Sequence, residues 1–226
     1  MYDSEVLLPS AAGEAPNPPS RFCLASLADI NYDEERRISF MQFWHYCRRH
    51  DYGFVYSLQN IDRARPPSWS KIPLVLRAME RYEWVWWADA DVLITNPSIT
   101  LESIVADAES AVPGVEFIIA RDRIPQSRMN CGSWLMRSCD ASRKFLQKVW
   151  DHYPHDAGFW EQGACNEMYD AGDWPINAYW IDRLRIQSFP AEWCEGDFNC
   201  HFAGTKDRAL KMSQLVRELK LDHSVS

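Results

Sequence analysis

The chain has 226 residues, an apolar fraction of 46% and a formal net charge of −8. This length suffices for one substantial domain, which we expect over residues 21–226. The negative charge argues against a nucleic-acid binder, which would need a basic patch, but it is compatible with an acidic ligand that a metal ion holds. No apolar run approaches the roughly 20 residues that span a bilayer, and no signal peptide is visible.

The first half of the sequence predicts strands that alternate with helices. Residues 1–20 are rich in Pro, Ala and Ser without periodicity, so we expect a flexible tail there. A strand is predicted over 21–29 and a helix over 33–50, where apolar residues recur at helical spacing. A second strand over 53–59 precedes a Pro-rich stretch and a helix that ends near Tyr82.

The third predicted strand, "WVWWADAD" over 84–91, ends in the carboxylates of Asp89 and Asp91. Strands that alternate with helices are typical of an α/β protein whose sheet carries helices on its faces. In such sheets ligands bind beyond the carboxyl ends of the strands. Both carboxylates are therefore expected at the ligand-binding edge.

The second half of the sequence is less regular. Two short strands are predicted at 116–122 and 133–138. A helix is predicted at 140–152, another from about Gly158, and a closing amphipathic helix at 208–221. Between the last two of these helices lies an aromatic, Pro-interrupted segment that we expect to form strands and loops that shape a surface. The large aromatic residues of this half would line a binding cleft, with at least half of them in the core. The aromatic candidates of this half are Trp134, Trp160, Trp174, Tyr179, Trp180 and Trp193.

Asp89 and Asp91 form the strongest chemical signal in the sequence. Residues two apart on a strand point to the same side, and two adjacent carboxylates repel unless a cation or a proton lies between them. A divalent ion that accepts oxygen ligands, Mn²⁺ or Mg²⁺, would resolve this repulsion. The alternative is a solvated acidic loop, but the apolar strand before the motif and its place at the sheet edge favour a metal site.

Histidine and cysteine provide weaker signals. His201, in "HFAGTK", is a further candidate ligand, although a single histidine is also typical of a core position. The other histidines have no partner at metal-ligand spacing, and they are His45, His50, His152, His155 and His223. None of the seven cysteines forms a CxxC pair, and Cys194 with Cys200 could form a disulfide in an oxidising compartment.

Six stretches in order resemble glycosyltransferase family 34, which includes fungal galactosyl- and mannosyltransferases and plant xyloglucan xylosyltransferases. They are "NYDEERRISFMQFWHYCRRHDYGF", "WSKIPLVLRAM", "WVWWADADVLITNP", "NCGSWLMRS", "EQGACNEM" and "HFAGTK". The resemblance implies a GT-A fold, with one mixed sheet flanked by helices. It also implies transfer of a sugar, with retention of configuration, from a nucleotide sugar such as UDP-galactose, UDP-xylose or GDP-mannose to an oligosaccharide or glycoprotein acceptor.

The resemblance also implies roles for individual residues. Asp89 and Asp91 would hold Mn²⁺ or Mg²⁺ together with His201, with Asp91 favoured as the direct ligand. Glu161 and Gln162 match a pair near the donor sugar and the acceptor and are the catalytic candidates, together with Lys206, which would contact the donor diphosphate. The donor-binding candidates are Ser26, Lys71, Asp89, Asn130, Gly132, Ser133 and Lys206. Glu161 is the only carboxylate of the set that could act as a nucleophile, and we favour attack from the same face as the leaving group.

Some features depart from the family, and other functions remain open. Thr205 stands where similar proteins often have Cys, so no family disulfide is expected there. Similar proteins are Golgi membrane proteins that face the lumen; no anchor is visible here, so the compartment stays open, as does oligomerisation. A catalytically inactive carbohydrate-binding protein would be expected to have a broken metal set, whereas a scaffold subunit stays open. A nucleotidyltransferase would be expected to have a Gly-rich loop after the first strand, where "LASLADINYDEE" contains no glycine.

Overall fold

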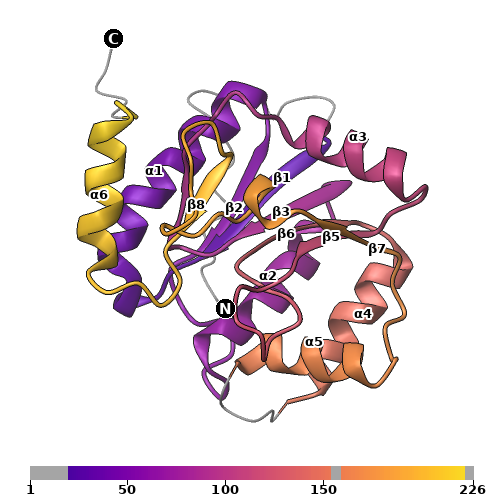
Figure 1. The fold of residues 1–226 in the computed structure, drawn as a ribbon. Helices are drawn as coiled ribbons and strands as arrows, with labels where there is room; N and C mark the ends of the chain where they lie inside the picture. The colour runs from indigo at the N-terminus through magenta and orange to yellow at the C-terminus, as the bar shows by residue number, and fades with distance from the viewer. Residues whose placement is uncertain (1–19, 154–158, 222–226) are drawn as a thin grey trace, which may run out of the picture.

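The computed structural model describes residues 20–153 and 159–221 (Figure 1). The predicted tail lies outside the described residues except for Ser20. The helices are α1 (Asp33–His50), α2 (Lys71–Ala78), α3 (Leu101–Ala111), α4 (Asp140–Asp151), α5 (Trp160–Asp170) and α6 (Arg208–Glu218). The strands are β1 (Phe22–Leu27), β2 (Gly53–Ser57), β3 (Trp84–Ala88), β4 (Val92–Ile94), β5 (Phe117–Ala120), β6 (Ser133–Arg137), β7 (Ala178–Ile181) and β8 (Asn199–His201).

Six strands form one mixed sheet in the order β2-β1-β3-β6-β5-β7. β1 pairs in parallel with β2 and β3, and β5 pairs in parallel with β7, whereas β6 is antiparallel to β3 and β5. Because β6 is reversed, its first residues lie at the edge where β3 ends, and Asp89 N donates a hydrogen bond to Gly132 O at 2.8 Å. The predicted α/β class, with a single mixed sheet flanked by helices, is confirmed.

The sheet separates two apolar cores because the residues of its strands alternate between the two faces. In β3, Trp84 and Trp86 belong to the core under α1 and α3, whereas Val85 and Trp87 belong to the core under α2, α4 and α5. Figure 1 shows these two groups of helices on different sides of the sheet. Every residue of β3 is buried, which explains why the strand appears as a continuous apolar run in the sequence.

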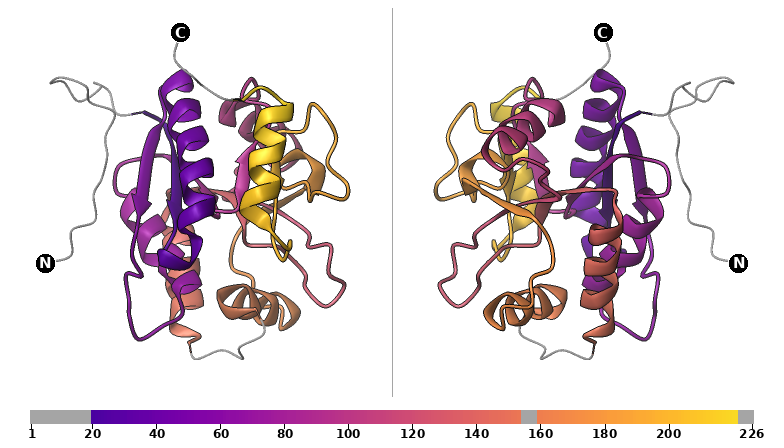
Figure 2. Two further views of the ribbon diagram at one scale, coloured as in Figure 1. Left: turned by 90° about the vertical axis from the view of Figure 1, so that its left-hand side faces the viewer. Right: turned by 90° about the vertical axis from the view of Figure 1, so that its right-hand side faces the viewer.

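A second, two-stranded antiparallel sheet connects the region after β3 to the C-terminal part of the chain. β4 pairs with β8, and Val92 lies opposite His201. Leu93 and Cys200 of this sheet pack with Met212 of α6, which lies beside α1 (Figure 2). The pairing places the residue before β4, Asp91, next to the last residue of β8, His201.

The structure corrects several local predictions. Helix α3 was not predicted, and α2 ends at Ala78 instead of near Tyr82. In α1 two of the apolar residues at helical spacing, Met41 and Trp44, are 56% and 37% exposed. The predicted start of α5 near Gly158 lies outside the described residues, and the helix begins at Trp160.

Two features bear on compartment and anchoring. All seven cysteines lie within the described residues, and none is bridged, so the Cys194–Cys200 disulfide that the sequence left open is not formed. Cys194 is exposed, whereas Cys200 is buried in β8. Within the described ranges no helix has both the length and the apolar character that a membrane crossing requires.

Candidate active site

A pocket of about 420 Å³ opens at the sheet edge where β1 and β3 end. Its wall is formed by the segments that follow these strands, the loop before β6, the last residue of β8, and the first residues of α5 and α6. The sequence-predicted residues that line it are Lys71, Asp89, Asp91, Asn130, Gly132, Glu161, Gln162 and His201. Most of the predicted site therefore comes together in one cavity.

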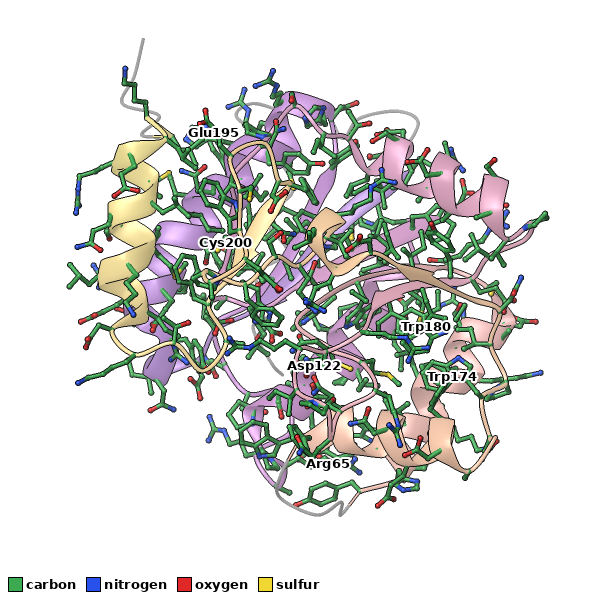
Figure 3. All side chains as sticks on the ribbon, in the orientation of Figure 1. Arg65, Asp122, Trp174, Trp180, Glu195 and Cys200 are labelled. Atoms are coloured by element: carbon green, nitrogen blue, oxygen red, sulfur yellow. The ribbon has the colours of Figure 1, made fainter. Side chains whose placement is uncertain are left out.

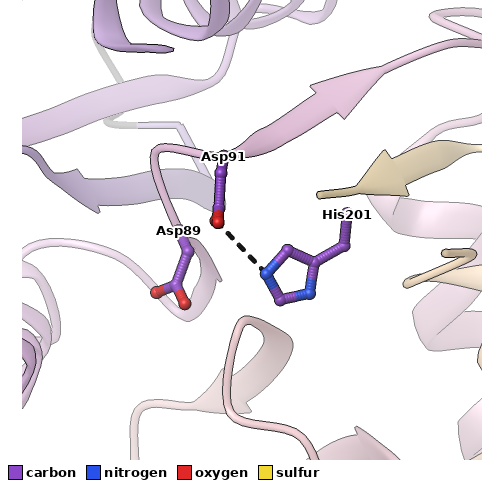
Figure 4. Close-up of side chains that lie close together, drawn as sticks. All are labelled: Asp89, Asp91 and His201. Atoms are coloured by element: carbon purple, nitrogen blue, oxygen red, sulfur yellow. Dashed lines mark ion pairs between the residues drawn. The ribbon is translucent and has the colours of Figure 1, made fainter. Parts of the chain in front are cut away.

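Asp89, Asp91 and His201 form a group that can hold a metal ion. One donor atom from each lies within 4.8 Å of the others, and among the described residues no other such group of three is found. Asp91 Oδ1 is 3.2 Å from His201 Nε2 (Figure 4). The His201 side chain is only 2% exposed, and neither ring nitrogen meets hydrogen-bond geometry with any described residue. Because an unsatisfied buried polar group is costly, this donor set fits a divalent cation.

Asp91 and His201 stabilise each other's charged form. Burial alone would raise the pKa of the Asp91 carboxyl, but the neighbouring charges of His201 and then Arg208 outweigh burial and lower it. Burial alone would lower the pKa of His201, and the carboxylate of Asp91 reverses this effect and raises it. A metal ion must bind the neutral imidazole, so its binding at this group would release the proton that Asp91 favours on His201.

The His201 ring lies directly against the backbone of Gly132. A Cβ atom added to Gly132 would lie 2.1 Å from His201 Cε1, far inside van der Waals contact. The Gly132 amide donates to Asn130 Oδ1 at 2.9 Å, which fixes this loop in front of β6. Gly132 is therefore required by the close approach of the imidazole, whatever its role toward a donor sugar.

A second charged group lines the same pocket. Lys71 Nζ lies 2.5 Å from Glu161 Oε1 and 3.4 Å from Asp89 Oδ1, and it donates to Cys131 O at 2.9 Å. Burial alone would lower the pKa of Lys71, but the two carboxylates outweigh burial and raise it. Burial raises the pKa of Glu161, and Lys71 offsets part of that effect. Lys71 is thus a buried, charged lysine held between two carboxylates.

The Gln162 side chain is fully engaged with the loop that precedes β6. Its Oε1 accepts from Cys131 N at 2.8 Å, and its Nε2 donates to Ser127 Oγ at 2.9 Å and to Asp122 Oδ2 at 3.1 Å. Asn130 Nδ2 also donates to Asp122 Oδ2, at 3.2 Å. Asp122, labelled in Figure 3, lies after β5 and was not predicted from the sequence. It orients two pocket amides at once.

Three predicted donor-binding residues do not line the pocket. Ser26 is fully buried and donates to Ala88 O at 2.7 Å, and Ser133 accepts from Trp86 Nε1 at 3.0 Å. Both hydroxyls therefore join neighbouring parts of the sheet. Lys206 is exposed and is not among the lining residues. The lining cation in that segment is Arg208, for which the sequence had no signal beyond a basic residue at the start of a helix.

Of the six aromatic candidates for an acceptor cleft, only Trp160 lines the pocket. It is 48% exposed and has a left-handed backbone, with φ of 46°. Trp134 is buried in the core, and Trp174 and Trp180 stack with their ring centroids 6.4 Å apart (Figure 3). The remaining two, Tyr179 and Trp193, are partly buried and pack against core clusters, as Trp174 and Trp180 do. Only Trp134 of the six is itself a buried core residue, so the expectation that at least half are core residues is not met.

Comparison with known proteins supports the resemblance. The model of the galactosyl transferase GMA12/MNN10 family matches residues 33–113. "Probable glycosyltransferase 3" from Oryza sativa subsp. indica is 34% identical over 105 residues, which cover 45% of this chain and 22% of that protein. "Probable alpha-1,2-galactosyltransferase gmh1" from Schizosaccharomyces pombe is 23% identical over 205 residues, covering 70% of this chain and 60% of that protein. The chain thus spans about a fifth of the length of the rice relative.

A solved structure matches the fold over most of the chain. The glycosyltransferase involved in the glycosylation of the major capsid of PBCV-1 superposes with a TM-score of 0.69 at 17% identity, covering 85% of this chain and 99% of that one. This likeness concerns the fold, which is of the GT-A type. Together, the family model and the relatives support the resemblance to the galactosyl transferase GMA12/MNN10 family, glycosyltransferase family 34, over the parts of the chain that they match.

Proposed function

We propose that this chain is a metal-dependent, retaining glycosyltransferase that moves a hexose or pentose from a nucleotide sugar to an oligosaccharide or glycoprotein acceptor. The observation that carries the proposal is the placement of Asp89, Asp91 and His201 in one pocket with the buried Lys71–Glu161 pair. Relatives named as galactosyl- and xylosyltransferases support UDP-galactose, UDP-xylose or a similar donor, with GDP-mannose kept as an alternative.

The metal group would act where the sugar–phosphate bond breaks. A divalent ion, Mn²⁺ or Mg²⁺, bound by Asp89, Asp91 and His201 would neutralise the negative charge that develops on the departing nucleoside diphosphate. Lys71 holds Asp89 on one side and Glu161 on the other, so it fixes the metal group relative to α5. Gln162 and Asp122 keep the Asn130–Gly132 loop in place against His201.

Retention is best explained by attack from the same face as the leaving group. Glu161 Oε1 is bound to Lys71 Nζ, and a carboxylate that stabilises a buried ammonium is a weak nucleophile. The Gln162 amide already makes three hydrogen bonds to the protein. In the same-face route the sugar–phosphate bond breaks, the acceptor oxygen bonds to the same sugar carbon, and the leaving phosphate oxygen accepts the acceptor's hydroxyl proton.

Trp160 supports a carbohydrate acceptor at the pocket mouth. Its indole is 48% exposed, although a large apolar side chain gains free energy by being buried. A flat aromatic face of this kind suits the C–H face of a sugar ring. We therefore propose that Trp160 contacts the acceptor glycan. A Golgi location for this chain, like that of similar proteins, stays a prediction.

The proposal is tested by calorimetric titration of UDP and GDP into the protein, with and without Mn²⁺. We expect one nucleotide to bind in a Mn²⁺-dependent manner, and we expect Asp91→Ala and His201→Ala to abolish that dependence because each removes a ligand. Asp173→Ala, which removes a surface carboxylate paired with Lys148, is the matched control and should bind as the wild type does. Failure of both nucleotides to bind in every condition would contradict a transferase and favour a carbohydrate-binding or scaffold protein.

A further inference from the structure

Arg208, the first residue of α6, supplies a positive charge to the pocket beside the metal group. Its Nη1 lies 3.8 Å from Asp91 Oδ2, within ion-pair range but too far for a hydrogen bond. The side chain is 24% exposed and lines the pocket. Its charge therefore lies next to any group that binds a metal ion held by Asp91.

Two residues from the start of the chain hold the guanidinium in place. Arg208 Nε donates to Glu35 Oε1 at 3.1 Å, and Nη1 donates to Tyr32 Oη at 3.3 Å. The guanidinium carbon also lies 4.4 Å from the centre of the Tyr32 ring, in cation–π range. Glu35 is itself buried in α1, so this anchor is fixed by the fold.

The same guanidinium retains donors for a ligand. Arginine has five N–H donors in a planar fork, and among the described residues Nη2 of Arg208 makes no hydrogen bond. Such a fork matches two oxygens of a phosphate, which a lysine ammonium contacts only as a point charge. Lys206, two residues earlier, is exposed and lies outside the pocket lining.

We propose that Arg208 is the cationic contact for the donor diphosphate, and that Glu35 and Tyr32 position it. This inference rests on the proposed function, because it assumes that a nucleoside diphosphate binds at the metal group. It assigns to Arg208 the role that the family resemblance gives to Lys206. Glu35 and Tyr32 would act through the orientation of the guanidinium and not by contact with the reacting atoms.

The test compares nucleoside diphosphate with nucleoside monophosphate, using UDP and UMP, or GDP and GMP, titrated in the presence of Mn²⁺. Loss of a charged hydrogen-bond donor corresponds to about a tenfold to hundredfold loss of affinity. We expect that loss for the diphosphate in Arg208→Met, with a much smaller change for the monophosphate. Arg217→Met removes an exposed arginine from the same helix and should leave both affinities unchanged.

Further variants separate a ligand contact from a structural role. Glu35→Gln keeps the guanidinium but weakens its anchor, so we expect an intermediate loss of the diphosphate preference. Arg208→Lys keeps the charge without the fork and should lose part of the preference, which covers the case in which Arg208→Met does not fold. Lys206→Met is expected to reduce the diphosphate preference less than Arg208→Met does.

The outcomes distinguish this inference from the proposed function. If the wild-type protein binds the diphosphate and both Arg208→Met and Arg208→Lys keep its preference over the monophosphate, the inference is wrong and the proposed function stands. A loss of that preference in Lys206→Met alone would return the role to Lys206. If the wild-type protein binds no nucleotide, the proposed function fails together with the inference.

Discussion

The two charged groups of the pocket differ in how completely the protein satisfies them. Lys71 and Glu161 lie 2.5 Å apart, and Lys71 also reaches Asp89 and the carbonyl of Cys131. His201, in contrast, has no hydrogen-bond partner among the described residues, although its side chain is almost completely buried. One group is thus paired internally, and the other has donor atoms available for an added cation.

This difference indicates that the two groups have different roles: the Lys71–Glu161 pair stabilises the pocket, and the Asp89, Asp91 and His201 group is available for a cation. The Lys71–Glu161 ion pair is buried, although Glu161 Oε2 makes no hydrogen bond with a described residue, and it stabilises its surroundings only as long as both partners remain. The His201 imidazole lies at ion-pair distance from Asp91, but its ring nitrogens make no hydrogen bond within the described ranges, a cost that a bound cation can remove. Asp89 belongs to both groups, because its Oδ1 accepts from Trp87 Nε1 at 2.7 Å and lies 3.4 Å from Lys71 Nζ. Asp89 therefore links the Lys71–Glu161 pair to the Asp91 and His201 side chains.

The largest loss of unfolding free energy is expected from removing Lys71, the cation of the Lys71–Glu161 pair. Lys71→Met would leave the Glu161 and Asp89 carboxylates without their buried cation, which costs about 3–5 kcal/mol of unfolding free energy. Urea denaturation measures this loss. The matched control is Lys148→Met, since Lys148 pairs with Asp173 at the surface and such a pair contributes about 0–1 kcal/mol. Equal costs for the two variants would show that the Lys71 group is not internally satisfied.

A smaller loss of unfolding free energy is expected when a side chain is added next to His201. Gly132→Ala would place a Cβ 2.1 Å from His201 Cε1. Overpacking of this kind typically costs about 1–3 kcal/mol, and here it would also displace His201, the proposed metal ligand. The measurement is the unfolding free energy of Gly132→Ala alone and in a His201→Ala background. Because His201→Ala removes the ring, the cost should largely disappear there, and an unchanged cost would contradict the contact.

The smallest effect concerns the backbone that directs Glu161 toward Lys71. Trp160 precedes Glu161 with φ of 46°, a conformation that costs a non-glycine residue about 1–2 kcal/mol. Trp160→Gly should therefore be more stable than Trp160→Ala in urea denaturation. Lys144, exposed in α4, is the control position, because there alanine should be the more stable by about 1 kcal/mol. The same order at both positions would argue against strain at Trp160.

Local pattern predicted most of the sheet and helices, because burial on two faces produces apolar runs such as β3. It should also have identified α3, where Leu101, Ile104, Val105 and Ala108 recur at helical spacing. Thr100 caps that helix by accepting a hydrogen bond from Ser103 N at 3.1 Å. The sequence around α3 therefore contains both a helical apolar pattern and a cap that predict this helix.

The candidate site was predictable only where chemistry is local. Asp89 and Asp91 could be identified from the strand before them, His201 was only a weak signal on its own, and Glu161 depended on resemblance to a family. The pairing of Lys71 with Glu161 joins α2 to α5, and no sequence spacing encodes it. The same holds for Arg208, whose partners Tyr32 and Glu35 lie at the opposite end of the chain.

The pairing of β4 with β8 assembles the metal group from distant parts of the chain. Asp91 precedes β4 and His201 ends β8, so the group is complete only after a long loop closes, at an entropic cost. A cation that binds the closed arrangement would favour it by mass action. Amide hydrogen exchange should then slow in β8 and α6, far more than in β2, when the ion is added. The ion would thus join the middle of the chain reversibly to its C-terminal part.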